Sequence, residues 1–266
     1  MNIAKLGPWT LHEKIGSGEF GNVNVATEPS ISGNWVIKYC KIGKTKKEKS
    51  MCNTIYAEYL NYINLRDLDF IPTLPAKKFY GEDNNYRYLV MERLDITLTE
   101  YLKNIPDFKS LMNVAYNLML DLKKLHAKRY MVNDVKPDNF MLKYDRIYFI
   151  DLGAFMVHPS SNRTPGNIEY AWFNILKGNT INYTDDIEGV LFMIIEVLSP
   201  LPWSGNTEQE YISNKLLYNI KSETNLLREW LESADLKEFY EIFEDTSKGN
   251  RNYDLYLNII DKLALN

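Results

Sequence analysis

In the first part of the chain the apolar residues come in short runs, a pattern typical of strands. The runs "NVNVA" (22–26), "NWVIKYC" (34–40) and "YRYLVME" (86–92) are rich in β-branched and aromatic residues, and we expect each to form a strand. Between them, "NTIYAEYLNYINL" (53–65) places its apolar residues at helical spacing. The pattern predicts a strand-rich region with one helix before about residue 95.

After about residue 95 the apolar spacing becomes helical. Two sets of apolar residues each fall on one face of a helix: Leu111, Ala115, Leu118, Leu122 and Leu125, and Ile187, Leu191, Ile194 and Leu198. The whole pattern predicts an α+β fold in a single domain, residues 1–266. A small β-rich lobe would span about 1–93, and a larger, mostly helical lobe about 94–266.

Composition indicates an ordinary globular protein with a substantial core. Of the 266 residues 45% are hydrophobic, and 31 basic against 35 acidic side chains give a formal charge of −4. This balance favours neither nucleic acid nor an anionic membrane as a partner, and we expect a monomer. The basic run "KIGKTKKEK" (41–49) is interpreted as a solvated loop, with a docking patch as the alternative.

Cysteine usage and hydropathy indicate the compartment. Cys40 and Cys52 lack metal-binding spacing, which favours a reducing intracellular setting over a disulfide framework. The longest apolar run, Val190 to Ile195, is too short to span a bilayer, and "MNIAKLGPWT" lacks a signal-peptide core. We therefore expect a protein of the cytoplasm, with the nucleus also accessible, and no membrane partner.

Three glycines, Gly16, Gly18 and Gly21, lie in "KIGSGEFGNVNVA". Such a loop either cradles phosphates with its backbone amides or simply makes a tight turn between strands. A lone G-x-G-x-x-G is a weak signal, and in dinucleotide-binding folds it opens a helix. Here the residues after Gly21 alternate as in a strand, so we expect the loop to join strand to strand.

A lysine and a glutamate in the same region occupy positions where an unpaired charge would be costly to bury. Lys38 ends the apolar run "NWVIK", where a cation is expensive to bury unless an anion is near. Glu58 lies on the apolar face formed by Ile55, Tyr59, Tyr62 and Ile63. We expect the two charges to pair, and a Glu58 turned to solvent at the rim of that face is the alternative.

The segments "NDVKPDNFML" and "IYFIDLG" carry the densest polar chemistry. Asp134, Lys136 and Asn139 fall within six residues on a stretch that Pro137 prevents from being regular helix. Asp151 follows an apolar run and precedes Leu152 and Gly153. Phosphoryl transfer needs a base, a lysine that offsets charge on the phosphoryl group, and oxygen ligands for Mg²⁺, and these segments contain each group.

These motifs together resemble those of eukaryotic-type protein kinases, in particular the casein kinase I and vaccinia-related kinase branch. "DVKPDNFML" is similar to the catalytic loop of that branch and "IGSGEFG" to its glycine loop. "SPLPW" (199–203) resembles the segment that closes its helix F, and "NYDLYLNIIDKL" its last helix. The similarity extends from about Trp9 to Leu263, and it implies a bilobal protein kinase fold. A chain of this branch rich in Asn, Tyr and Ile is also compatible with a large DNA virus, whose protein would work in the host cytoplasm.

The resemblance implies a role for each matching residue. Asp134 would be the catalytic base, Lys136 would steady the γ-phosphate, and Asn139 and Asp151 would bind Mg²⁺. Lys38 would contact the α- and β-phosphates of ATP and pair with Glu58. The residues implied in binding the rest of the nucleotide are Gly16, Gly18 and Gly21 for phosphates, Ile15, Val23, Val36, Met91 and Met141 around adenine, and Glu92 to Leu94 as the hinge.

The sequence also departs from the kinase pattern. Val132 and Asn133 replace the usual His-Arg, Leu152 replaces the phenylalanine after the metal-binding Asp, and Trp35-Val36 stands where Val-Ala is common. Asn167 replaces a threonine that bonds the catalytic Asp, and residues 182–184 replace paired arginines that favour acidic or prephosphorylated substrates. Two functions remain open: a kinase that phosphorylates serine and threonine hydroxyls of proteins, and a pseudokinase that serves as a binding scaffold.

Overall fold

The computed structural model describes residues 4–18, 21–157, 168–171, 176, 180–220 and 225–265, apart from the side chains at 18, 47 and 51. Its contacts divide the chain into two compact units. The first comprises Met1–Asp95 and Met141–Ala154, and the second Ile96–Phe140 and Phe155–Asn266. No helix in the described part of the chain is both long and apolar enough to cross a membrane.

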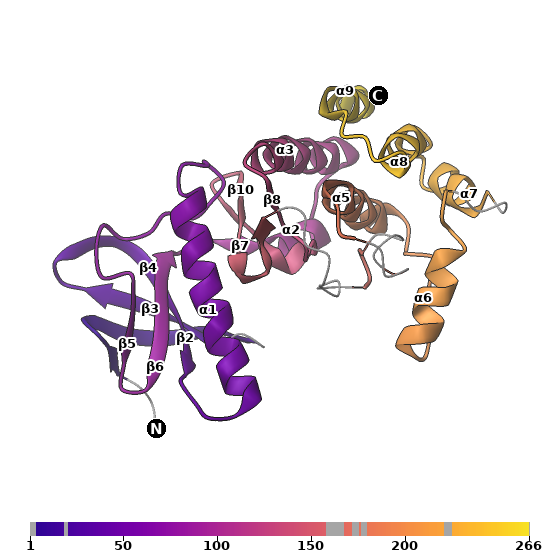
Figure 1. Ribbon diagram of the computed structural model, residues 1–266. Helices are drawn as coiled ribbons and strands as arrows, with labels where there is room; N and C mark the ends of the chain where they lie inside the picture. Colours follow the sequence, from indigo (N-terminus) through magenta and orange to yellow (C-terminus); the bar gives the residue numbers. More distant parts are fainter. Residues whose placement is uncertain are drawn as a thin grey trace. The chain divides into compact units, whose positions relative to one another are not determined.

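The first unit is built on a six-stranded antiparallel sheet (Figure 1). Its strands, in spatial order, are β1 (Lys5–Leu6), β2 (Trp9–Gly18), β3 (Gly21–Glu28), β4 (Ile31–Lys41), β6 (Tyr86–Glu92) and β5 (Tyr80–Asp83). The runs 22–26, 34–40 and 86–92 lie within β3, β4 and β6, so the three strand predictions are confirmed.

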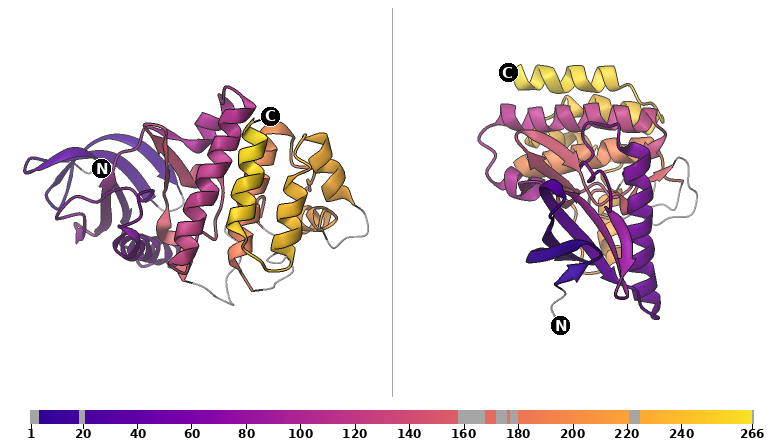
Figure 2. Two further views of the ribbon diagram at one scale, coloured as in Figure 1. Left: turned by 90° about the horizontal axis from the view of Figure 1, so that it is seen from above. Right: turned by 90° about the vertical axis from the view of Figure 1, so that its left-hand side faces the viewer.

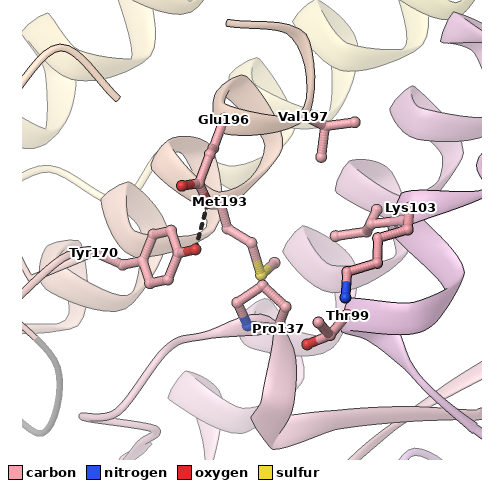
Figure 3. A pocket seen from close by; sticks show the side chains of 8 residues that line it. Thr99, Lys103, Pro137, Tyr170, Met193, Glu196 and Val197 are labelled. Carbon is pink, nitrogen blue, oxygen red and sulfur yellow. Dashed lines mark hydrogen bonds between the residues drawn. The ribbon is translucent and has the colours of Figure 1, made fainter. Parts of the chain in front are cut away.

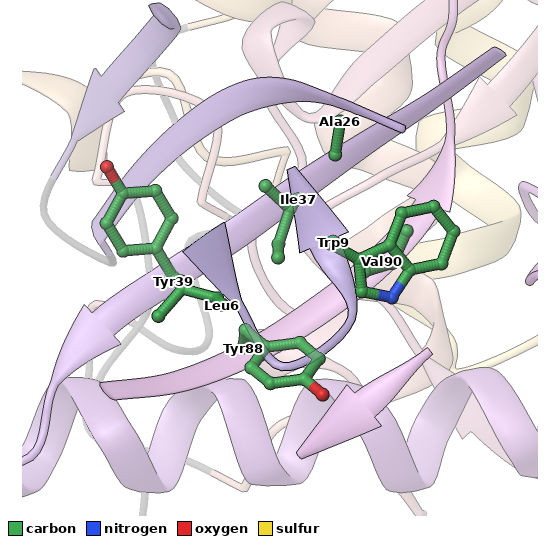
Figure 4. Packing of buried hydrophobic residues seen from close by; sticks show 7 residues of the cluster. All are labelled: Leu6, Trp9, Ala26, Ile37, Tyr39, Tyr88 and Val90. Carbon is green, nitrogen blue, oxygen red and sulfur yellow. The ribbon is translucent and has the colours of Figure 1, made fainter. Parts of the chain in front are cut away.

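β4 is buried on both faces of this sheet. Ile37 and Tyr39 point into a cluster with Leu6, Trp9, Ala26, Tyr88 and Val90 (Figure 4). Because side chains alternate along a strand, Val36, Lys38 and Cys40 face the opposite side, where α1 (Lys46–Leu65) packs against β4 and β6. The alternation thus puts Lys38 on the helix side of the sheet, and burial of both faces explains the continuous apolar run.

The basic run 41–49 is only partly a loop, which corrects the interpretation from sequence. α1 already begins at Lys46. Thr45 caps the helix by accepting a hydrogen bond from the backbone N–H of Glu48, and the Glu48 side chain accepts from the Thr45 N–H. This reciprocal capping box satisfies amides that the helix leaves unpaired, and the Thr-x-x-Glu spacing was its readable signal.

The segment Met141–Ala154 contributes β10 (Arg146–Phe149), the turn η2 (Leu152–Ala154) and most of β9 (Phe140–Lys143), which pairs with β10. η2 packs closely on α1. A Cβ at Gly153 would lie 2.5 Å from the Thr54 Cγ2 atom, and Asn61 Nδ2 donates to the Leu152 carbonyl at 2.7 Å. These contacts fix the backbone next to Asp151 against the helix that carries Glu58.

The second unit is mostly helical. Its helices are α2 (Leu98–Lys103), α3 (Phe108–Ala127), α5 (Tyr183–Leu198), α6 (Glu208–Leu216), α7 (Leu226–Ser233), α8 (Phe239–Ser247) and α9 (Tyr253–Leu265). Short elements are β7 (Ile96–Thr97), η1 (Pro137–Asn139) and the antiparallel pair β8 (Tyr130–Met131) and β11 (Met156–Val157). α3 packs against α9 and α5 (Figure 2).

The helical faces predicted from periodicity form the core of this unit. All five positions from Leu111 to Leu125 on α3 are buried, as are Ile187, Leu191 and Ile194 on α5. Leu198 is 40% exposed because α5 ends at this residue. A sheet with one long helix followed by a mostly helical part confirms the predicted α+β fold class.

Candidate active site

A buried charge cluster lies between β4, α1 and the segment after β10 in the first unit. Lys38 Nζ lies 2.8 Å from Glu58 Oε2 and also forms an ion pair with Asp151 Oδ1. Lys38 is 7% exposed and Glu58 1% exposed, whereas the Asp151 side chain is 35% exposed. The inward orientation of Glu58 is confirmed, and the solvent-facing alternative is wrong.

Burial and the charges of this cluster shift the pKa values of Lys38 and Glu58. Burial lowers the pKa of Lys38, but the charges of Glu58 and Asp151 outweigh it and raise that pKa above its ordinary value. Burial raises the pKa of Glu58 to about 7, because the Asp151 charge acts in the same direction and Lys38 only partly opposes them. The two carboxylates therefore keep Lys38 charged, while burial makes Glu58 hold a proton more readily than an exposed glutamate does.

The glycine segment joins β2 to β3, as predicted. Gly18 pairs with Gly21 and Gly16 with Val23 across the two strands, while residues 19 and 20 lie outside the described part. Gly21 has a φ of +124°, and a Cβ there would overlap the carbonyl oxygen of Tyr39 on β4. Only glycine fits this position without strain.

Three of the residues expected around adenine, Val23, Val36 and Met91, share one face of the sheet. Val36 pairs with Met91, and Val23 with Lys38, so these four side chains project from the side of the sheet that α1 covers. Val36 and Met91 are buried, and Tyr62 donates a hydrogen bond to the Met91 sulfur at 3.2 Å. Leu94 is also buried, Val23 and Met141 are half-buried, and Ile15 is 46% exposed.

The predicted hinge is held by its own backbone and side-chain bonds. Glu92 N–H donates to the Thr73 carbonyl, Arg93 N–H to the Asn34 carbonyl and Asp95 N–H to the Leu142 carbonyl, each at 2.9 Å. The Leu94 N–H takes no part in these bonds, so it is the hinge amide they leave for a ligand.

The Glu92 carboxylate anchors the same strand end. It accepts bonds from the Thr73 N–H and hydroxyl and pairs with Lys143. Burial works against ionisation of Glu92, but these partners hold its pKa below the usual range. Neither Lys143 nor Thr73 was predicted from sequence, because each contact joins segments far apart along the chain.

The second unit contains the loop with Asp134, Lys136 and Asn139. Lys136 Nζ lies 2.8 Å from Asp134 Oδ2. Asn139, on η1, donates its amide N–H to the Asp134 carbonyl at 2.7 Å and to Asp134 Oδ2 at 2.8 Å. The three predicted residues therefore form one contiguous polar group. Because the Asn139 amide nitrogen is committed to Asp134, its amide oxygen is the atom suited to a cation.

One oxygen of the Asp134 carboxylate is free. Asp134 is 7% exposed, its Oδ2 accepts from Lys136 and Asn139, and its Oδ1 is buried without a hydrogen-bond partner among the described residues. A buried, unpaired carboxylate oxygen is costly. The arrangement leaves one acceptor available for a hydroxyl group, while the other oxygen is held in place.

Asp186 anchors the start of this loop, and sequence reasoning missed it. This α5 residue is 1% exposed and accepts bonds from the Val132 N–H at 2.7 Å and the Asn133 N–H at 2.9 Å. Its carboxylate also lies 3.0 Å from His126 Nε2. Asn133 has a φ of +63°, which asparagine tolerates better than most residues. The "TDDIE" acids at a helix start were a signal, but only the fold shows that Asp186 is the one that bonds the loop.

A cavity of about 360 Å³ adjoins the loop at Pro137 (Figure 3). Its other lining residues are Thr99, Leu102, Lys103, Tyr170, Met193, Glu196 and Val197. The Tyr170 hydroxyl donates to the Glu196 carboxylate across one side. Its lining combines apolar side chains, such as Met193 and Val197, with polar ones, such as Thr99 and Glu196, which suits an amphipathic side chain.

Asn167 lies outside the described part of the chain. The same holds for Ser160, Ser161 and Thr164, the hydroxyl-bearing residues between Asp151 and Asn167. The structure groups Lys38, Glu58 and Asp151 in the first unit, and Asp134, Lys136 and Asn139 in the second.

Comparison with known proteins agrees with this chemistry. The chain is 26% identical over 238 residues to a probable serine/threonine-protein kinase of Dictyostelium discoideum, with 80% of this chain and 46% of the relative covered. The chain thus spans about half the length of that relative. The model of the protein kinase domain matches residues 9–251. Since this match covers most of the sequence, the chain belongs to the protein kinase domain family.

Proposed function

We propose that this chain is a serine/threonine protein kinase, which transfers the γ-phosphoryl group of Mg-ATP to protein hydroxyls. The supporting observation is the Asp134 carboxylate. Its Oδ2 is held by Lys136 and Asn139, and its buried Oδ1 has no partner among the described side chains. A fixed acid with one free acceptor oxygen suits a base that orients a substrate hydroxyl and takes its proton.

In this proposal the first unit holds the nucleotide. Lys38, oriented by Glu58, contacts the α- and β-phosphates, while the backbone at Gly16, Gly18 and Gly21 approaches the phosphates closely. Adenine packs among Ile15, Val23, Val36, Met91 and Met141, and the backbone from Glu92 to Leu94 reads its edge. The Leu94 N–H, which takes no part in the bonds that the neighbouring hinge amides make, and the shared sheet face of Val23, Val36 and Met91 support this assignment.

Mg²⁺ would be bound by Asp151 and the amide oxygen of Asn139. Both are hard oxygen ligands of the kind Mg²⁺ prefers, and Asp151 is partly exposed. No cluster of three or more metal-binding side chains occurs among the described residues. Mg²⁺ commonly relies on one or two protein carboxylates together with phosphates and water. When bound, the ion neutralises charge on the phosphates.

We also assign the chain to the casein kinase I and vaccinia-related branch, on the motifs that resemble it. At the positions where members of the branch carry paired arginines, this chain has other residues, which make other contacts. Asn182 caps α5 through its side chain, and Tyr183 is buried beneath the Arg251 guanidinium, 4.2 Å from its ring centre. We therefore expect no strong preference for acidic or prephosphorylated substrates at this position.

A phosphate-transfer assay tests the proposal against a pseudokinase. Purified protein is incubated with γ-labelled ATP, Mg²⁺ and a panel of generic protein substrates, and phosphoamino acids are identified. We expect label on serine and threonine that disappears in the Asp151→Asn variant and persists in Asp145→Asn, a change at an exposed turn. ATP binding without transfer to any substrate would contradict the proposal and indicate a scaffold.

A further inference from the structure

Lys215 on α6 is fully buried, which is unusual for a lysine. Its ammonium lies 4.9 Å from the ring centre of Phe192 and 4.7 Å from that of Trp203. Burial lowers its pKa well below the ordinary value, although Glu169 and Glu188 act in the opposite direction. Keeping a cation in such surroundings is costly unless specific bonds compensate.

The compensating bonds go to the backbone of one short stretch. Lys215 Nζ donates to the Ile168 carbonyl at 3.1 Å and also to the Glu169 carbonyl. The next residue, Tyr170, is fixed from the other side, because its hydroxyl donates to Glu196 on α5 (Figure 3). The stretch 168–171 is thus held between α6 and α5.

This stretch lies beside the catalytic loop. Gly189 on α5 marks the closest approach: a Cβ there would lie 3.0 Å from Val135 Cβ and 3.4 Å from the Tyr170 carbonyl oxygen. Val135 follows Asp134 directly. Tyr170 and Pro137 also line the same cavity of about 360 Å³. A protein substrate whose hydroxyl reaches Asp134 would therefore pass close to the 168–171 backbone.

We propose that Lys215 is a positioning residue for the protein substrate: by bonding the Ile168 and Glu169 carbonyls, it fixes the wall beside Asp134 along which the acceptor polypeptide lies. Lys215 does not touch the reacting atoms. The aromatic rings and the length of the lysine stem set the position of its ammonium. This inference rests on the proposed kinase function and names a determinant of protein-substrate binding within it.

The test compares Lys215→Met, which keeps an apolar stem and removes the donors, with Lys215→Arg, which keeps donors and charge. Lys237→Met, at an exposed lysine of the same unit, is the matched control. We expect Lys215→Met to lower kcat/KM for a protein acceptor by about tenfold or more. KM for ATP and the rate of ATP hydrolysis, in which water accepts the phosphoryl group, should change by less than about twofold. Lys215→Arg should recover part of the loss.

A second readout does not depend on activity. Amide hydrogen exchange in peptides covering 168–171 should be faster in Lys215→Met than in wild type or Lys237→Met, with α3 peptides unchanged. Equal exchange at 168–171, or an equal loss of hydrolysis and protein phosphorylation, would overturn the inference. Global unfolding of both Lys215 variants would overturn it too, since the lysine would then serve stability alone. If the wild type transfers no phosphate, the proposed function fails, and exchange still decides the role of Lys215.

Discussion

Lys38 joins two acids that come from distant parts of the sequence, and this single side chain links β4, α1 and the segment after β10. Under the proposed function the link has a mechanistic meaning, because Lys38 would contact phosphate correctly only if Glu58 orients it. The effects of removing Lys38 and Glu58 should therefore overlap.

A double-mutant cycle measures that overlap. Lys38→Met and Glu58→Gln should each reduce turnover, and the double variant should lose much less than the product of the two single losses. We expect a coupling of about 1–3 kcal/mol, the range found for side chains in direct contact. Steady-state kinetics with a protein acceptor gives the four values required. Multiplicative losses would show that the ion pair plays no role in positioning phosphate.

The raised pKa of Glu58 predicts a pH dependence of stability in the nucleotide-free protein. The folded carboxyl titrates near pH 7, above its ordinary value of 4.5, so the folded state holds the proton more tightly. Stability from this group is therefore fully present below pH 4.5 and is lost as the pH rises to about 7. The loss should be on the order of 1–3 kcal/mol.

Urea unfolding of wild type and Glu58→Gln at several pH values between 4.5 and 7.5 checks this. The free energy of unfolding of the wild type should fall with rising pH more steeply than that of the variant, since other buried acids contribute equally to both. Identical slopes would mean that Glu58 is ionised throughout and that Lys38 fully offsets its burial.

At the level of elements, the hairpin of β2 and β3 depends on the glycine next to β4. Gly21→Ala should destabilise the protein by about 1–3 kcal/mol, because alanine would adopt a strained φ and meet the Tyr39 carbonyl. Gly16→Ala is the matched control, since its Cβ would lie 3.7 Å from Val23 Cβ in ordinary contact. Chemical denaturation measures both. Equal stability of the two variants would contradict the assigned conformation of Gly21.

The elements themselves were largely predictable from the sequence. β4 and β6 are short apolar runs rich in β-branched and aromatic residues, and α3 carries a clear period of 3.6 residues. The start of α1 was misjudged because a run of lysines looks like a loop, although Thr45 and Glu48 provide a capping signal. In such a short run the like charges favour a loop, whereas the capping hydrogen bonds of Thr45 and Glu48 favour a helix. Here the helix forms.

The candidate site was predictable only where motifs carry it. Lys38 and Glu58 are costly charges among apolar residues, whereas Asp134 lies in a dense polar stretch, and both patterns are visible in the sequence. Asp186 and Lys215 were not predicted, because their partners lie 54 and 47 positions away. A lysine normally indicates solvent exposure, and nothing local to Lys215 signals its burial.

For the molecule as a whole, the uncharged side chain of Asn133 predicts that activity does not depend on phosphorylation. In kinases activated by phosphorylation, an arginine at this position binds a phosphate on the activation segment. Asn133 carries no charge, and its N–H is already bonded to Asp186. We therefore predict an enzyme that is active as synthesised. The segment with Ser160, Ser161 and Thr164 lies outside the described residues, so this stays a prediction from sequence.

Phosphatase treatment and a variant with Ser160, Ser161 and Thr164 all changed to Ala test this independence. Both samples should keep the activity of untreated wild type to within about tenfold, which corresponds to about 1.4 kcal/mol of transition-state stabilisation. A larger drop in either sample would show that a phosphate orders the site, with Arg163 as a nearby candidate to bind it.

In the proposed mechanism, Asp134 acts on the substrate hydroxyl and does not hold the nucleotide. The most direct measurement is single-turnover phosphoryl transfer by Asp134→Asn, with Mg-ATP affinity determined on the same protein. We predict that transfer falls by about 10²–10⁴-fold, since the variant keeps the shape but loses the base, while ATP affinity changes little. Transfer at the wild-type rate would show that Asp134 is not the base. A loss of ATP affinity as large as the loss of transfer would show that it holds the nucleotide.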